Sequence, residues 1–152
     1  MLVMLPELAA ETADWPGRLE AAAPGLRVVA PGEAADAIAE ADAAYGVLPE
    51  ELLGRATRLR WLQAPQAGPA PDFYYPALVE HPVTVTNMRD TYTDHVAAHT
   101  LALVLAMARG LPRYVLDQQA VRWAPDWDPG SVLALSEANA LIIGAGAVGA
   151  EV

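Results

Sequence analysis

A glycine-rich run near the end of the chain has the residue types and spacing of a nucleotide-binding turn. Gly144, Gly146 and Gly149 form the pattern G-x-G-x-x-G directly after the apolar run Leu141-Ile142-Ile143, which predicts a buried strand. In such a turn the first glycine permits a tight bend, the second lets the backbone approach a pyrophosphate, and the third lets helix and strand pack closely. The alternative is that small residues only pack a strand-to-helix turn. The preceding strand favours the dinucleotide-binding interpretation over this alternative. The predicted cofactor-binding residues in this run are Gly144, Gly146, Ala147, Val148 and Gly149.

The histidines do not form a predicted metal site or acid–base pair. His95 and His99 are four residues apart and share a helix face, but Val96 stands where the zinc-protease pattern has Glu, and no third ligand is near. His81 precedes Pro82, which is typical of an exposed turn. We therefore predict no metal-binding residue and no catalytic residue in this chain.

The composition excludes several classes of partner. The formal net charge is −10, all nine basic residues are Arg, and cysteine is absent. An acidic surface repels phosphate backbones and anionic lipid heads, so we expect neither nucleic acid nor a membrane surface as partner. The apolar residues 1–5 are too few for the core of a signal peptide, and the apolar stretch 96–108 is shorter than the roughly 17–25 residues of a membrane span. We expect a cytoplasmic protein.

Five short apolar runs separated by helix-like stretches predict an α/β fold, with a parallel sheet and helices on both faces. The predicted strands are residues 1–5, 26–30, 43–48, 59–64 and 83–87. The first helix-like stretch between them is interrupted by Pro16 and Gly17, the next covers residues 32–41, and another begins at Pro49. Ligand-binding loops of such sheets lie at the carboxyl ends of the strands. The candidate loops are residues 47–48, 64–68 and 87–90.

The strongest predicted helix runs from Thr93 to Arg109. A basic residue in its last turn, Gly110 just past it and Pro112 beyond form a complete stop signal. Its body is apolar almost all round, so it must be covered on more than one side, by two domains or by a partner subunit. A second helical stretch covers residues 113–123, and residues 124–130 are predicted to form a loop or linker.

Taken in order, these segments resemble the D-isomer-specific 2-hydroxyacid dehydrogenases. The resemblance covers about residues 40–152 and depends on Leu59-Arg60-Trp61-Leu62-Gln63, Ala67-Gly68, the strand 83–87, the long helix around His99, Trp123 and the glycine run. It implies a flavodoxin-like substrate-binding domain that packs against a Rossmann nucleotide-binding domain. We assign residues 1–92 to the substrate-binding domain, 93–130 to interdomain helices and a linker, and 131–152 to the first strand of an incomplete Rossmann domain.

The resemblance also implies a function and residues for it. The family transfers hydride between NAD or NADP and a 2-keto acid or D-2-hydroxy acid. The backbone amides of Gln66, Ala67 and Gly68 are implied donors to the substrate carboxylate, and a Pro- and Gly-rich surface turn is the alternative. Thr100 matches a position that faces the cofactor, and its alternative is a buried hydroxyl bonded back to its own helix. The resemblance implies a homodimer packed about the helix from Thr93 to Arg109.

The chain departs from the family pattern in two respects. Ala98 stands where the family commonly has Glu. The family's catalytic Arg, its acidic partner and its acid–base His lie downstream of the glycine run, so we expect a truncated N-terminal portion that is inactive alone. The alternative function is a non-catalytic dimerisation or binding module of flavodoxin-like fold.

The end of the chain carries an expectation of its own. Only three residues follow Gly149, and helix nucleation fixes about that many before propagation begins. We therefore expect no helix there, and we expect residues 141–149 to be disordered or packed against a neighbouring chain.

Overall fold

The computed structural model describes residues 1–4, 10–123 and 132–152. The chain divides into two compact units, Met1–Thr91 and Tyr92–Val152. The loop predicted at residues 124–130 lies outside the described residues. Within the described part, no helix combines the length and the apolar character needed to cross a membrane.

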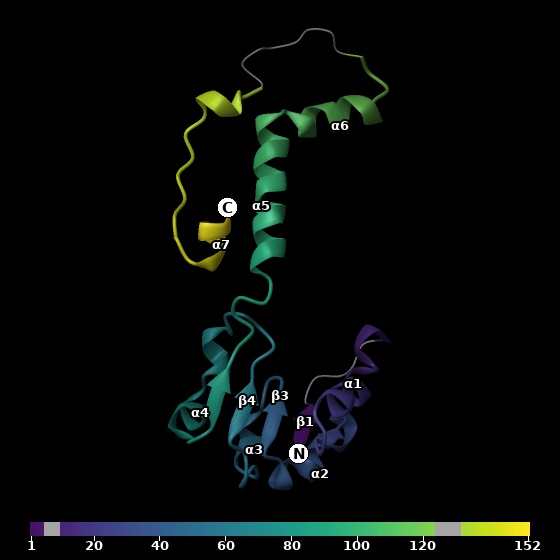
Figure 1. Ribbon diagram of the computed structural model, residues 1–152, viewed down its shortest axis with the longest axis vertical. Helices are drawn as coiled ribbons and strands as arrows, with labels where there is room; N and C mark the ends of the chain where they lie inside the picture. The colour runs from purple at the N-terminus through teal and green to yellow at the C-terminus, as the bar shows by residue number, and fades with distance from the viewer. Residues whose placement is uncertain (5–9, 124–131) are drawn as a thin grey trace. The chain divides into compact units, whose positions relative to one another are not determined.

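The first unit is built on a five-stranded parallel sheet, whose strands lie side by side in Figure 1. The strands are β1 (Leu2–Met4), β2 (Val28–Val29), β3 (Ala43–Tyr45), β4 (Trp61–Gln63) and β5 (Thr84–Thr86). Their order, β2-β1-β3-β4-β5, is the order of a flavodoxin-like sheet. The predicted fold class is therefore confirmed, and each strand lies inside one of the five apolar runs.

Short helices connect the strands of this unit. They are α1 (Trp15–Ala22), α2 (Ala34–Ala37), α3 (Glu50–Leu53) and α4 (Pro76–Glu80), with 3-10 turns at Ala10–Thr12, Pro31–Glu33, Ile38–Glu40 and Pro71–Phe73. The prediction that Pro16 and Gly17 interrupt the first helix was wrong, because α1 runs through both residues. Pro16 lies in its first turn, where a missing N–H removes no helical hydrogen bond. Helix α4 was not predicted.

One face of the sheet carries the hydrophobic core. Val3, Ala44 and Leu62 are completely buried on this face, on three adjacent strands. Side chains from the connecting helices and turns complete the cluster, and they are Ala34, Ile38, Leu53, Phe73 and Leu78. Burial on this scale explains why strands of two or three residues hold together.

The opposite face of the sheet is covered only in part. Side chains alternate along a strand, so Tyr45, Trp61 and Gln63 lie on this face. Trp15 of α1 packs edge-on against Tyr45, with ring centroids 6.1 Å apart. Over β4 and β5 the face is more open, and 45% of the Trp61 surface is exposed.

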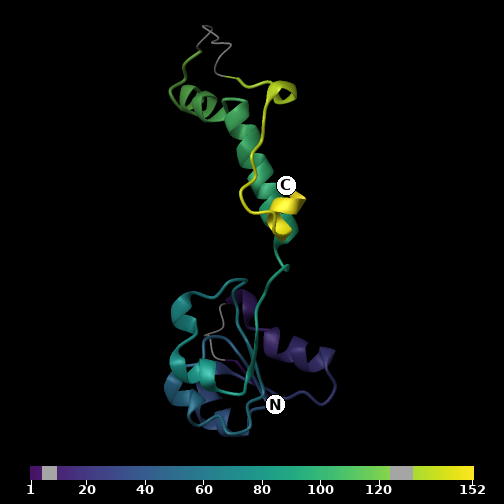
Figure 2. The same ribbon diagram turned by 90° about the vertical axis from the view of Figure 1, so that its left-hand side faces the viewer.

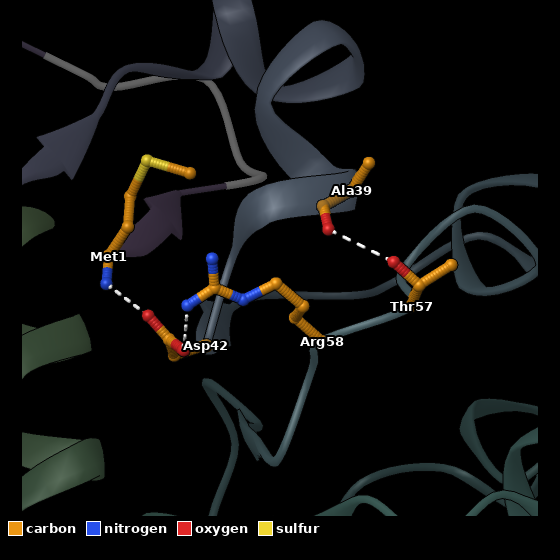
Figure 3. A network of polar contacts seen from close by, with 5 residues as sticks. All are labelled: Met1, Ala39, Asp42, Thr57 and Arg58. Atoms are coloured by element: carbon orange, nitrogen blue, oxygen red, sulfur yellow. Dashed lines mark hydrogen bonds and ion pairs between the residues drawn. The ribbon is translucent and has the colours of Figure 1, made fainter.

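The amino edge of the sheet is held by an ion-pair cluster (Figure 3). The N-terminal ammonium of Met1 donates to Asp42 Oδ2 at 2.7 Å, and Arg58 Nη2 donates to Asp42 Oδ1 at 3.0 Å. Nearby, Thr57 Oγ1 donates to the carbonyl of Ala39 at 3.2 Å. These contacts hold the pKa of Asp42 below its ordinary value of 3.8: the hydrogen bond from the ammonium lowers it most, burial opposes, and Arg58 lowers it further. The charges at this edge therefore pair with one another.

The second unit contains α5 (Thr93–Ala108), α6 (Leu111–Gln119) and α7 (Ala147–Glu151), with a 3-10 turn at Leu135–Glu137. Arg109 follows α5, and Gly110 adopts the left-handed conformation with φ of 65°, as the predicted stop signal requires. In α6 the carboxylate of Asp117 is buried and pairs with Arg122 and, at 3.8 Å, with Arg113.

The C-terminal segment runs along α5, as Figure 2 shows. The N–H of Leu133 donates to the carbonyl of Ala108 at 2.8 Å. Residues 141–143 were predicted to form a strand, but they pair with no strand in the described parts of the chain, and Ile143 is 91% exposed. The predicted absence of a helix was also wrong, because α7 begins at Ala147, inside the glycine motif, and not after Gly149. Residues 141–149, expected to be disordered or packed against a neighbouring chain, lie beside α5 of their own chain.

Candidate functional site

The loop after β4 presents three consecutive backbone amides at the carboxyl edge of the sheet. Gln66, Ala67 and Gly68 are exposed, and none of their N–H groups donates to an acceptor in the described parts of the chain. Parallel α/β sheets bind ligands at this edge. Successive N–H groups without protein acceptors can bind an anion.

The start of this loop is fixed by neighbouring backbone. The N–H of Ala64, a completely buried residue, donates to the carbonyl of Thr86 at 2.8 Å. The carbonyl of Gln66 accepts from the N–H of Met88 at 3.0 Å. Pro65 has no N–H to donate. The loop that carries the N–H groups of residues 66–68 is therefore held in place by hydrogen bonds at Ala64 and at the Gln66 carbonyl.

The loop after β5 lies next to it and adds a guanidinium group. Met88, which bonds Gln66, is followed by Arg89, whose N–H donates to Asn87 Oδ1 at 3.1 Å. The guanidinium of Arg89 is 3.9 Å from the carboxylate of Asp90 and is largely exposed. Arg89 was not among the predicted site residues. The signal for it was available, because it is the only basic residue in the three loops expected at the carboxyl edge.

The glycine run adopts a turn that places each glycine in a different environment. Gly144 has φ of 97°, a conformation that glycine adopts without strain. A Cβ on Gly149 would lie 2.1 Å from the carbonyl oxygen of Gly144, so only hydrogen fits there. A Cβ on Gly146 would meet no atom within 4 Å, so the backbone at Gly146 is open to approach.

An apolar groove in the second unit brings Thr100 together with part of the glycine run. Thr100 on α5 lines this groove with Gly144, Val148 and Gly149, whereas Gly146 and Ala147 do not line it. The hydroxyl of Thr100 donates to the carbonyl of Val96 at 2.8 Å, so it bonds back to its own helix as the alternative has it, but Thr100 is half-buried and not buried.

None of the three histidines lies beside the exposed amides of residues 66–68: His81 is at the other edge of the sheet, and His95 and His99 belong to the second unit. His81 precedes β5, at the amino edge of the sheet, and its Nδ1 accepts the N–H of Val83 at 3.2 Å. His95 and His99 are exposed on α5. Among residues 1–4, 10–123 and 132–152, no group of three His, Cys, Asp or Glu side chains could hold a metal ion.

Comparisons with known proteins give structural neighbours only. No protein-family profile and no curated protein matches the chain, whereas 67 chains of solved structures do. A D-isomer-specific 2-hydroxyacid dehydrogenase from Xanthobacter autotrophicus Py2, in complex with NADPH and MES, is 25% identical with a TM-score of 0.75, over 99% of this chain and 49% of that one. A family member from Aeromonas salmonicida subsp. salmonicida A449 is 26% identical with a TM-score of 0.65, over 81% of this chain and 40% of that one.

A third neighbour agrees in fold at lower identity. The D-lactate dehydrogenase of Aquifex aeolicus, complexed with NAD and lactic acid, is 17% identical with a TM-score of 0.68, over 99% of this chain and 46% of that one. This chain therefore spans less than half the length of each of these three neighbours.

Proposed function

We propose that this chain is the N-terminal part of an NAD(P)-dependent oxidoreductase of the D-isomer-specific 2-hydroxyacid dehydrogenase family, to whose solved structures it is similar. The reaction class is the interconversion of 2-keto acids and D-2-hydroxy acids. The observation that carries the proposal is the row of three exposed amides, Gln66, Ala67 and Gly68, at the carboxyl edge of the sheet.

The amides suit the carboxylate that every 2-keto acid carries beside its carbonyl group. An N–H that donates to a carboxylate forms a charge-assisted hydrogen bond, about twice as strong as a neutral one. Gly68 has open space around its α-carbon, so nothing hinders the approach of the ligand. The chain carries a net charge of −10, so local donors must attract the anion. Arg89 on the adjoining loop, which pairs with Asp90 at 3.9 Å, adds further N–H donors. The loop would hold the carboxylate and thereby orient the carbonyl carbon.

The glycine run has the geometry for a dinucleotide pyrophosphate. The bend at Gly144 and the open backbone at Gly146 fit such a group, and the contact between Gly149 and Gly144 leaves no room for a side chain. We assign cofactor binding to Thr100 and to five residues of the glycine run, Gly144, Gly146, Ala147, Val148 and Gly149. Of these, Thr100, Gly144, Val148 and Gly149 line the groove. When bound, NAD(P)H supplies the hydride that reduces the keto carbon.

The proton for the carbonyl oxygen requires a separate acid. His81 lies at the amino edge of the sheet, away from residues 66–68, and its Nδ1 already accepts a hydrogen bond. His95 and His99 have no carboxylate partner within the described residues that would orient them. We propose that the 152-residue chain alone does not turn over.

The long helix α5 supports a homodimer. Its large apolar side chains include Val96 and Leu105, which do not line the groove and are each 44% exposed. Exposed apolar side chains on a helix are suited to contact with another protein chain. We propose that the helix from Thr93 to Arg109 packs against a second copy of the chain. The same surface is the observation that favours the second candidate function, a non-catalytic dimerisation or binding module.

Saturation-transfer NMR with two matched ligands tests the proposed function. Pyruvate carries the carboxylate, and methyl pyruvate has the same keto group without the charge. We expect transfer from the protein to pyruvate and none to methyl pyruvate. Equal signals for both ligands, or none for pyruvate, would refute the carboxylate site and leave the binding-module candidate. In an assay with glyoxylate or pyruvate, we expect the 152-residue chain to oxidise neither NADH nor NADPH. Steady oxidation of either cofactor would contradict the proposal that the chain alone does not turn over.

A further inference from the structure

Three side chains on the more open face of the sheet form a continuous chain of hydrogen bonds. Trp61 Nε1 donates to Thr86 Oγ1 at 2.6 Å, and Thr86 Oγ1 donates to Gln63 Oε1 at 2.6 Å. Gln63 Nε2 then donates to the carbonyl of Ala64 at 2.9 Å. The chain of bonds crosses from β4 to β5 and back, and it ends two residues before the exposed amides of residues 66–68.

The direction of these bonds is fixed by their chemistry. An indole N–H can only donate, so the Thr86 oxygen must accept from Trp61 and its own hydrogen is left to donate. The acceptor for that hydrogen must be the carbonyl oxygen of the Gln63 amide. The NH₂ group of Gln63 therefore faces Ala64, and no other orientation of the amide satisfies all three groups.

We propose that Trp61, Thr86 and Gln63 are positioning residues that orient the loop carrying the Gln66, Ala67 and Gly68 amides for a carboxylate ligand. The proposal rests on the function proposed above for that loop. We call the hydrogen-bonded chain Trp61–Thr86–Gln63 the relay. The Ala64 N–H donates to the Thr86 carbonyl and the Ala64 carbonyl accepts from the Gln63 side chain, so β5 and the relay fix both backbone polar groups of Ala64. The next amide with a hydrogen belongs to Gln66, because Pro65 has none. A change in the orientation at Ala64 is thus passed directly to the ligand-binding donors.

Matched threonine variants test the relay. Thr86→Val removes the hydroxyl that joins Trp61 to Gln63 and keeps the side chain's shape, whereas Thr86→Ser restores the hydroxyl. Thr84→Val is the control, because Thr84 is the same residue type on the same strand and face and its hydroxyl takes no part in the relay. Each variant of the 152-residue chain is titrated with pyruvate, and ¹H–¹⁵N NMR follows the amides of residues 66–68 and the Trp61 indole signal.

The expected results separate the relay from a general effect on the fold. In Thr86→Val both hydrogen bonds of the hydroxyl are lost, and we expect the Trp61 indole signal to move upfield. Pyruvate affinity should fall about three- to tenfold, the effect of losing about one hydrogen bond between the loop and the ligand. Thr86→Ser and Thr84→Val should keep the wild-type affinity, and the amide signals of Val3 and Ala44, on β1 and β3, should not move in any variant. If pyruvate shifts the amides of residues 66–68 equally in Thr86→Val and wild type, the relay is refuted and the carboxylate loop stands. If pyruvate shifts none of these amides in the wild type, the proposed function and the relay both fail.

Discussion

The variant Gly149→Ala tests whether the glycine run has the close packing described above. A Cβ at this position would lie 2.1 Å from the Gly144 carbonyl oxygen and 3.2 Å from Ile142 Cγ2. Real Cβ contacts stay beyond 3.0 Å, and the obstructing atom is backbone in a turn with φ of 97°, so the turn must open. Overpacking of this kind costs about 1–3 kcal/mol. Helix propensity acts in the opposite direction, because Ala is about 1 kcal/mol better than Gly inside a helix.

The assay for this prediction is amide hydrogen exchange across α7, with Gly146→Ala as the matched control. In Gly149→Ala we expect faster exchange of the Ala150 and Val152 N–H groups, which donate to Gly146 and Val148 at 2.9 and 3.1 Å. Gly146→Ala should raise their exchange less, because its Cβ meets no atom within 4 Å and only the N-cap preference for Gly over Ala is lost. Slower exchange in Gly149→Ala would show that helix propensity dominates and that the turn is not closed as described.

Three further predictions concern the first unit. Gly68→Ala should keep the melting temperature, since no atom lies within 4 Å of its Cβ, but should weaken pyruvate binding about threefold or more by obstructing the ligand. Gly17→Ala is the control, and unchanged pyruvate binding in Gly68→Ala would refute a close approach of the ligand to the Gly68 backbone. Asp42→Asn should destabilise the chain at pH 7, and because the folded pKa of Asp42 is below 3.8, the difference from wild type should disappear as the pH falls through that folded pKa; urea unfolding at several pH values measures it, and a difference that grows on acidification would contradict it. Tyr75→Phe should lose about 1 kcal/mol in urea unfolding because the Tyr75 hydroxyl donates to the Leu48 carbonyl at 2.8 Å, and Tyr74→Phe, the control, should lose less; equal losses would count against the bond.

The strands of the sheet could be predicted because their sequences are short, apolar and bounded by turn residues. All five observed strands lie inside predicted runs, although hydrogen-bonded pairing covers only two or three residues of each. Periodicity alone did not give the strand order, which came from the resemblance. That resemblance is confirmed by structural neighbours at 25% and 26% identity.

The errors have physical causes. Helix α4 is five residues long, too short for an apolar period to appear, although Pro76 in its first turn was a usable signal. The run Leu141-Ile142-Ile143 has the composition of a strand, but a strand needs a hydrogen-bonded neighbour, and none lies beside it in the described residues. Helix α7 was excluded because the count of its residues began after Gly149 and not at Ala147.

The candidate site could be predicted only in part. The position of residues 66–68 after a strand was sufficient to place them at the carboxyl edge, and their role in binding stays a prediction, as does that of Thr100. The relay through Trp61 and Thr86 could not be predicted, because it depends on the register that pairs Gln63 with Thr86. Residues 23 positions or more apart meet only once that register is known.

The most direct test of the central claim is a ¹H–¹⁵N NMR titration of the wild-type 152-residue chain with pyruvate. If the loop after β4 binds the carboxylate of a 2-keto acid, the largest shifts will occur at the N–H groups of Gln66, Ala67 and Gly68, with smaller shifts at Met88 and Arg89. Methyl pyruvate at the same concentration will leave these signals in place. Shifts confined to other residues, or equal shifts with both ligands, would contradict the account.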